Sequence, residues 1–192
     1  FITSTLVDPT LRSAGPDLVI QVLNLCDEYH FPTLPKASTL KTVLDRMQSD
    51  LHDIHVIRYV VEKTSGEQRT QVAQALANLI RTKPPPLNTV ISAIQENKSQ
   101  FDAASIDNFC DTALARSKTV DHSIAVSLLE FTVQILDAAS QSQKNAFVNH
   151  MIECMKETDP NRRQIGAEYY RKGRGFVEET TRRASARSLI LK

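Results

Sequence analysis

Apolar residues recur every three or four positions along most of the chain, in short runs that proline or glycine interrupts. Leu18, Val22, Leu25 and Tyr29 form the first clear run of this kind. An α-helix has about 3.6 residues per turn, so this spacing places the side chains on one helical face. A helix with one apolar face must bury it against another element. The pattern therefore predicts an all-α protein.

The ends of several runs carry residues that start or stop helices. Gly66 follows one run, and glycine readily takes the left-handed conformation that ends many helices. The run Pro84–Pro86 follows another and cannot continue a helix. Asp159 followed by Pro160 predicts a helix start, because an aspartate caps the free N–H groups and proline suits the first turn. We also expect five residues to form a core shared by the two long helices on either side of residue 139: Leu128, Phe131, Leu136, Phe147 and Met151.

The composition agrees with the prediction of an all-α protein. Of 192 residues, only 5 are glycine, 6% are aromatic and none is tryptophan, whereas sheets favour turns and aromatic-rich strands. The apolar fraction of 41% is that of an ordinary globular protein. We expect a helical repeat-like domain over residues 1–172 and a basic C-terminal helix or tail over residues 173–192.

The predicted helix pairs begin near residues 16, 51, 86, 120 and 160. These starts lie about 34–40 residues apart, which is the period of a helical hairpin. From residue 16 to about residue 172 the pattern resembles HEAT or armadillo-type repeats. The resemblance implies an α-solenoid of stacked antiparallel helix pairs. An irregular helical bundle would produce the same punctuation, so both architectures stay open.

The cysteines and histidines form few combinations that could bind a metal ion or catalyse a reaction. His52 and His55 lie three positions apart, and His150 and Cys154 lie four apart. A zinc site needs three or four protein ligands, and no further ligands accompany either pair. Cys154 also falls within an apolar run, where a free cysteine is usually a small buried side chain. With no phosphate-binding glycine motif and no nucleophile motif present, we expect no metal, no cofactor and no enzymatic activity.

Three cysteines are scattered through the sequence without a CxxC pair: Cys26, Cys110 and Cys154. This usage is typical of reduced thiols, and we expect an intracellular protein, either cytoplasmic or nuclear. No run of 18 apolar residues occurs, so we expect no membrane span and no membrane partner.

Charge is distributed unevenly. The chain has a net charge of +1, but residues 162–192 contain nine Lys and Arg against three Asp and Glu, a net of +6. This region is the candidate partner-binding surface. The candidate binding residues within it are Arg162, Arg163, Arg171, Lys172, Arg174, Arg182, Arg183 and Arg187.

The basic C-terminal region has several possible interpretations. It suits an acidic protein segment, or a nucleic acid whose bases stack on Tyr169, Tyr170 and Phe176. It is also what a solvated surface looks like. Backbone amides near Gly173 and Gly175 can cradle phosphate, although we favour a solvated loop there. Ser185 follows two arginines, as basophilic kinases prefer, and its phosphorylation would add about two negative charges.

The leading functional hypothesis is a non-catalytic scaffold that binds a protein segment on the surface of a helical array. A helical nucleic-acid-binding protein that uses the basic C-terminal region is the alternative. A structural, self-assembling subunit is the third.

Overall fold

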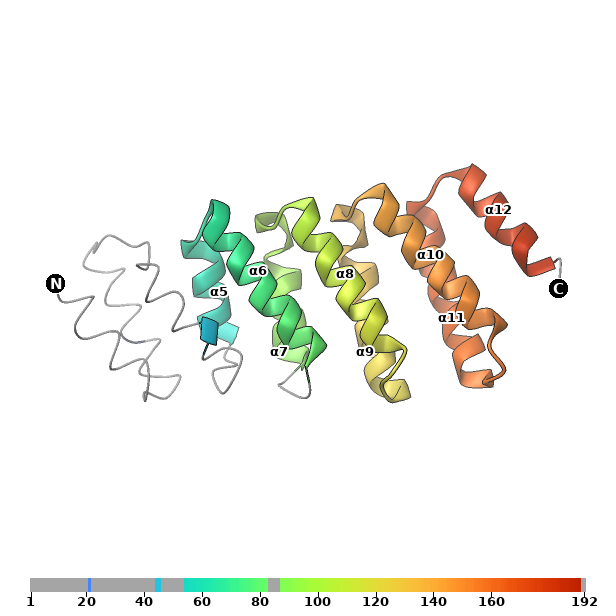
Figure 1. Ribbon diagram of the computed structural model, residues 1–192, viewed down its shortest axis with the longest axis horizontal. Coiled ribbons are helices and arrows are strands. Elements are labelled where there is room, and N and C mark those ends of the chain that lie inside the picture. The colour runs from blue at the N-terminus through green and yellow to red at the C-terminus, as the bar shows by residue number, and fades with distance from the viewer. Residues whose placement is uncertain (1–20, 22–43, 46–53, 83–86, 191–192) are drawn as a thin grey trace. The chain divides into compact units, whose positions relative to one another are not determined.

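The computed structural model describes residues 21, 44–45, 54–82 and 87–190. Within these ranges the chain forms eight α-helices and three short 3-10 helices, with no strand, which confirms the all-α prediction for this part (Figure 1). The apolar residues Leu18, Val22, Leu25 and Tyr29 lie outside the described residues, as do Cys26, His52 and Pro84–Pro86. The chain divides into two compact units, residues 1–101 and 102–192.

The first unit contains three described helices and a 3-10 turn. They are α5 (Ile54–Lys63), α6 (Gly66–Arg81), α7 (Leu87–Glu96) and η1 (Lys98–Gln100). The α7 helix packs against both α5 and α6. Gly66 has a φ of 53°, the left-handed conformation expected of it, although it begins α6 instead of closing α5. Val56, Ile57, Leu76, Ile80 and Ile94 are completely buried and form the centre of this core.

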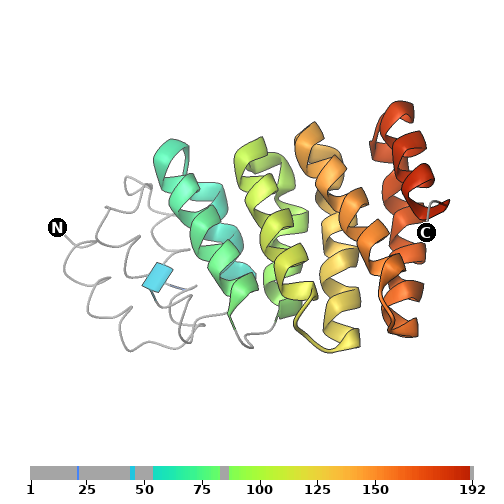
Figure 2. The same ribbon diagram turned by 45° about the vertical axis from the view of Figure 1, so that its right-hand side comes forward.

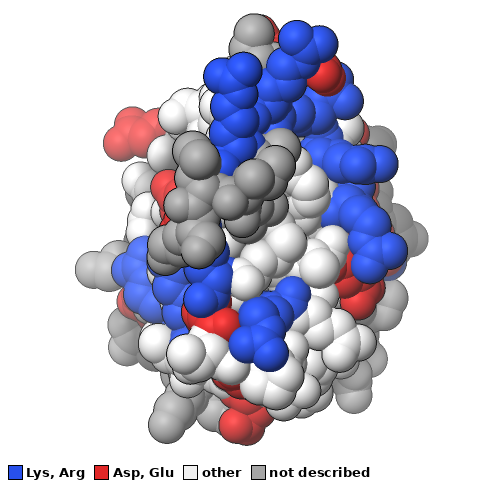
Figure 3. Space-filling view, turned by 90° about the vertical axis from the view of Figure 1, so that its right-hand side faces the viewer, with Lys and Arg blue, Asp and Glu red and all other residues white. Residues whose placement is uncertain are grey.

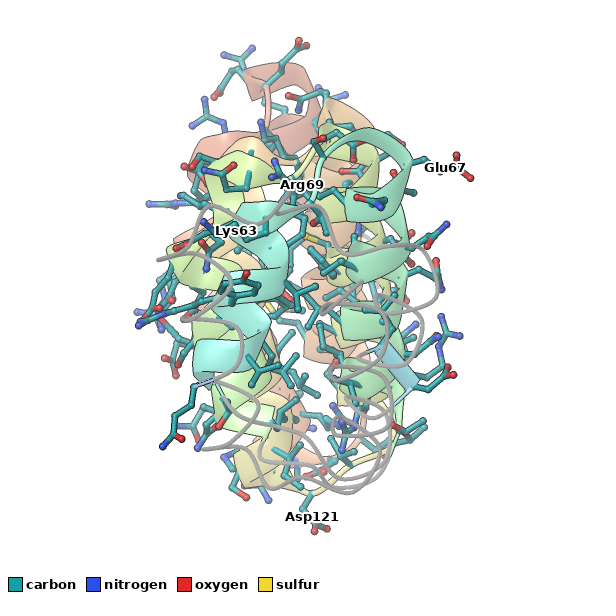
Figure 4. All side chains as sticks on the ribbon, turned by 90° about the vertical axis from the view of Figure 1, so that its left-hand side faces the viewer. Lys63, Glu67, Arg69 and Asp121 are labelled. Carbon is teal, nitrogen blue, oxygen red and sulfur yellow. The ribbon has the colours of Figure 1, made fainter. Side chains whose placement is uncertain are left out.

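Arg69 ties the end of α5 to η1. Its guanidinium donates to the backbone oxygens of Val61 (2.9 Å) and Thr64 and to that of Gln100 (3.0 Å). Figure 4 shows Arg69 at the junction of α5 and α6, whereas Glu67 points away from the helices. The last carbonyls of a helix lack intrahelical partners, so one arginine here satisfies several orphan acceptors at once.

The second unit contains two tightly packed helix pairs and one more helix. The first pair is α8 (Ala103–Ser117) with α9 (His122–Ile135), followed by η2 (Leu136–Ala138). The second pair is α10 (Gln141–Lys156) with α11 (Pro160–Gly173), followed by η3 (Arg174–Phe176). The last helix, α12 (Glu179–Ile190), packs against α10. Figure 2 shows the partners of each pair side by side.

The five predicted core residues between Leu128 and Met151 are all completely buried, as expected. The predicted pairing of the helices that carry them is wrong. The α9 helix packs chiefly on α8, and α10 packs chiefly on α11, so the two helices around Ala139 do not form the hairpin. The apolar stripes show which face of each helix is buried, but they do not show which neighbour covers it.

The links between successive pairs repeat along the sequence. The 3-10 turns begin at Lys98, Leu136 and Arg174, and 38 residues separate each from the next. The residue directly after each turn is buried: Phe101, Ala139 and Val177. The helices α8, α10 and α12 then begin at residues 103, 141 and 179, again 38 residues apart. The same short structural unit therefore occurs three times.

Polar side chains fix where these helices begin. The carboxylate of Asp102 accepts from Ser105 N at 2.8 Å, and the hydroxyl of Ser140 accepts from Gln143 N at 3.2 Å. Each cap satisfies an N–H group that the first turn of a helix leaves free. The Ser140 N–H in turn donates to the Asp107 carboxylate, 2.8 Å away on α8. The start of α10 is thus held by its own cap and by the preceding helix pair.

The α10 and α11 helices approach each other closely at Gly166. A Cβ at this position would lie 2.7 Å from Met151 O and 2.8 Å from the Met155 N. Both atoms belong to the backbone of α10, which cannot shift cheaply. Glycine is therefore required for this helix pair to form as it does.

Among the described helices, none combines the length and apolar character needed to cross a bilayer.

Candidate interaction surface

The basic residues of the C-terminal region are carried by α11, η3 and α12. The α11 helix begins where the sequence predicts, because Asp159 accepts from Asn161 N at 2.9 Å and Pro160 occupies the first turn. Figure 3 shows Lys and Arg side chains gathered at the top of this end of the molecule and along one edge, with uncharged residues between them. The contacts of each basic side chain separate this group into two sets.

Arg162 is used to hold the fold together. Its guanidinium donates to the backbone oxygens of Ser117 (2.8 Å) and Lys118 (2.6 Å) at the end of α8. Its side chain is only 17% exposed. The residue caps a helix C-terminus much as Arg69 does in the first unit, so little of its charge is available to a partner.

Lys172 lies in a network that joins α11 to α9. Its ammonium is 2.6 Å from Glu130 Oε2 and 3.3 Å from Glu168 Oε1. The hydrogen bond from Lys172 lowers the pKa of Glu130, and the same bond raises the pKa of Lys172. The ammonium also lies 4.4 Å from the centre of the Tyr169 ring. Two carboxylates thus already compensate the charge of Lys172, and the Tyr169 ring lies beside it.

Tyr169 is part of the core and not a stacking platform. It is 2% exposed, and its hydroxyl donates to Val126 O at 3.3 Å. Burial raises the pKa of its phenol to about 12. Of the three aromatic residues proposed to stack on bases, Tyr170 and Phe176 remain partly exposed.

Arg182 and Arg183 share one carboxylate. Both pair with Glu179 in the first turn of α12, at 3.0 Å and 3.1 Å. Their charges are therefore partly compensated within the same helix. Ser185 belongs to α12 as well, but its side chain lies outside the described residues, so the predicted phosphorylation site stays a prediction.

Four arginines remain without a carboxylate partner in the part of the chain that the structure describes. They are Arg163, Arg171, Arg174 and Arg187, and all four are exposed. Arg163 donates to the oxygens of Glu157 and Thr158, and Arg171 donates to Ala167 O at 3.3 Å. These are carbonyls of the same helix or of the turn before it, and they leave the positive charge uncompensated.

The glycines of the basic segment do not form the expected loop. Gly173 is the last residue of α11 and is buried, so the loop prediction is wrong for this position. Arg174, Gly175 and Phe176 form η3 directly after it. Phosphate prefers a helix N-terminus, whereas this is a C-terminus with the opposite dipole. Gly173 therefore supplies a packing contact with Phe147, and a Cβ at Gly175 would meet nothing within 4 Å.

His150 and Cys154 lie together on α10, with Sγ and Nε2 3.8 Å apart. Burial lowers the pKa of His150 to about 4, and the nearby Lys118 and Arg162 cations act in the same direction. Burial raises the pKa of Cys154. A neutral imidazole beside a protonated thiol is the opposite of an activated Cys–His pair, which needs a thiolate.

The remaining candidates give no further cluster. Burial, followed by the Asp107 and Asp111 charges, raises the pKa of Cys110 to about 12. His52 and the side chain of His55 lie outside the described residues. Within those residues, no three His, Cys, Asp or Glu side chains gather closely enough to hold a metal ion.

Sequence reasoning missed the division of the basic residues into two sets. The spacing of the residues partly indicates this division. On a helix, positions three and four apart share one face, and these positions are Arg163, Ala167, Tyr170, Arg171 and Arg174. Lys172 falls on another face. The acidic partners of Lys172 and the carbonyl partners of Arg162 come from α8 and α9, and only the fold brings them near.

No protein-family model, no curated protein and no solved structure matches the chain.

Proposed function

We propose that this chain is a non-catalytic protein-interaction scaffold built from HEAT or armadillo-type repeats of antiparallel helix pairs. The observation that carries the proposal is the 38-residue recurrence of a 3-10 turn, a buried residue and a helix start. Repeats of this kind bury their apolar faces against their neighbours and leave long surfaces that bind partner segments. Such a surface needs no reacting groups.

The state of the potentially reactive side chains supports binding over catalysis. Cys110 and Cys154 are buried thiols with raised pKa values, and His150 is a partly buried imidazole with a lowered pKa. Catalytic cysteines and histidines are usually tuned in the opposite sense, toward a thiolate or a base that titrates near neutral pH. The uncompensated cations lie on the surface instead, where they can meet a partner.

Affinity capture from nuclease-treated lysate, followed by chemical crosslinking, tests the proposal. The immobilised full chain should retain a defined, saturable protein partner after nuclease treatment. Loss of every partner after nuclease treatment, together with binding to single-stranded RNA or duplex DNA that falls steeply with salt, would favour the nucleic-acid alternative. Light scattering at increasing concentration of the purified chain distinguishes the self-assembling alternative, since a scaffold should not form large particles on its own.

A further inference from the structure

The α11 helix uses two of its sides within its own unit. Gly166 and Gly173 lie against α10, where a Cβ at either position would meet Met151, Met155 or Phe147. Tyr169 and Lys172 lie toward α9, through bonds to Val126 and Glu130. A third side remains. Its residues are Arg163, Ala167, Tyr170 and Arg171, and Arg174 continues it in η3 directly after the helix. We call these five residues the outer stripe.

The outer stripe combines an apolar centre with uncompensated charge. Ala167 and Tyr170 are partly exposed, and the three arginines around them are exposed. Within the described residues, none of the three makes an ion pair. Two acidic residues close to the stripe in sequence pair with other cations: Glu168 with Lys172, and Glu179 with Arg182 and Arg183.

We propose that the outer stripe binds an acidic amphipathic helix of a partner protein, antiparallel to α11. This inference rests on the scaffold function proposed above and specifies the chemistry of the partner. Arginine binds carboxylates through paired hydrogen bonds, and the uncharged centre of the stripe suits apolar side chains.

The spacing of the cations fits a helical ligand. With a rise of about 1.5 Å per residue, Arg163 and Arg171 are about 12 Å apart along α11, and Arg171 and Arg174 are about 4.5 Å apart. An antiparallel helix matches them with acidic residues at positions i, i+3 and i+11. Its apolar residues at i+4 and i+7 then meet Tyr170 and Ala167. All five ligand positions lie on one helical face.

The direction of the ligand follows from the charge distribution along the stripe. Arg171 lies in the last turn of α11 and Arg174 follows directly after it in η3, whereas Arg163 lies near the start of the helix. An antiparallel partner brings its N-terminal turn to the two clustered cations. Acidic residues in a first turn also stabilise their own helix, because they face the positive end of its dipole. A parallel partner would carry its paired acidic residues at the unfavourable end.

A nucleic acid fits the outer stripe less well. Tyr169 is buried, so Tyr170 is the aromatic residue that the stripe offers for stacking. Ala167 separates Arg163 from the other two cations and gives a phosphate backbone nothing to bind. Binding of bases needs successive aromatic platforms beside a continuous basic groove.

The test is fluorescence anisotropy with the full chain and a labelled designed peptide. The peptide is a helix of about 15 residues, the length at which isolated helices become marginally stable. It carries Glu at i, i+3 and i+11 and Leu at i+4 and i+7. We expect binding at least about tenfold tighter than for a scrambled peptide of equal composition, a difference of about 1.4 kcal/mol.

Charge reversal on the chain locates the site. The variant R163E/R171E/R174E should bind the designed peptide at least about tenfold more weakly than the wild type. Lys172 is left unchanged, because a glutamate there would place a third carboxylate beside Glu130 and Glu168. The control R81E/K118E/K144E changes the net charge equally at other surface sites and should bind within about twofold of the wild type. If the reversed variant loses its far-ultraviolet circular dichroism, R163Q/R171Q/R174Q replaces it and should show the same loss in weaker form.

Four results would overturn the inference. They are equal binding by the scrambled peptide, equal binding by polyglutamate, unchanged binding by the stripe variant, and tighter stripe-dependent binding to single-stranded RNA than to the peptide. The scaffold function can survive such a result. If the wild type and the stripe variant retain the same partners from nuclease-treated lysate, the scaffold stands and the site lies elsewhere, whereas retention of no partner by either protein rejects the scaffold itself.

Discussion

The ring of Phe147 on α10 occupies the space where a side chain at Gly173 on α11 would begin. A Cβ at Gly173 would lie 2.7 Å from Phe147 Cδ1 and closer still to Cε1. Gly173 has a φ of −86°, which any residue adopts. The glycine is therefore required by the aromatic ring and not by the backbone.

We predict that Gly173→Ala lowers the free energy of unfolding by about 1–3 kcal/mol, the usual cost of overpacking a core. Gly175→Ala is the control, because a Cβ there would have nothing within 4 Å. Adding Phe147→Leu should reduce the cost of the Gly173 substitution, since the clashing ring atoms are then absent. Urea unfolding of the wild type, Gly173→Ala, Phe147→Leu and the double variant measures this coupling, and additive effects would contradict the described contact.

Truncation of Phe131 tests the core of α9. Its side chain is completely buried, and Phe131→Ala should lower the free energy of unfolding by about 3–5 kcal/mol. Gln164 is exposed on α11, and Gln164→Ala should change it by less than about 0.5 kcal/mol. Chemical denaturation compares the two. Similar small effects at both positions would show that α9 does not bury this face.

The stability of the chain should fall in mild acid because of His150. Its pKa is lowered by burial to about 4, against an ordinary value of 6.5 in the unfolded chain. Between these values the unfolded state binds more protons than the folded state, so stability is lost as the pH falls from about 6.5 toward 4. His150→Gln should flatten the pH profile of the melting temperature in this window. Gln164→Ala, an exposed substitution that removes no titratable group, should leave the profile as in the wild type.

The thiols should be free but protected. Cys110 and Cys154 are buried and unpaired, and burial raises the pKa of each. A thiol reagent should label three groups in the unfolded, unreduced chain and should react with Cys110 in the folded chain only as fast as the protein opens. Labelling followed by mass spectrometry measures both. Fewer than three groups in the unfolded chain would reveal a disulfide, and stoichiometric zinc by elemental analysis would reveal a metal site.

Local features of the fold could be predicted from the sequence, and long-range ones could not. The start of α11 was predictable because Asp159 and Pro160 act on the next few residues. The burial of Phe131 and Phe147 was predictable from the spacing of apolar residues on their own helices. The pairing of α9 with α8 was not, because a stripe of apolar residues fits any neighbour of similar shape.

The candidate site shows the same limit. The sequence identifies every basic residue of the C-terminal region, but it cannot distinguish Lys172 from Arg171. Lys172 meets Glu130, 42 positions earlier, whereas the bond that Arg171 makes among the described residues is to Ala167 O, a carbonyl of its own helix. A difference of one position, about 100° around the helix, decides whether a cation stabilises the fold or remains available to a partner.

The bond from the Ser140 N–H to the Asp107 carboxylate has a consequence for the order in which the second unit forms. The acceptor, Asp107, belongs to α8, and the donor, Ser140, directly precedes α10. A chain that emerges from a ribosome N-terminus first therefore presents the acceptor before the donor. When α10 follows, its starting N–H finds a carboxylate already in position and its Ser140 hydroxyl can cap the new helix. The pair of α8 and α9 thus presents a docking point for the start of α10 before α10 itself exists.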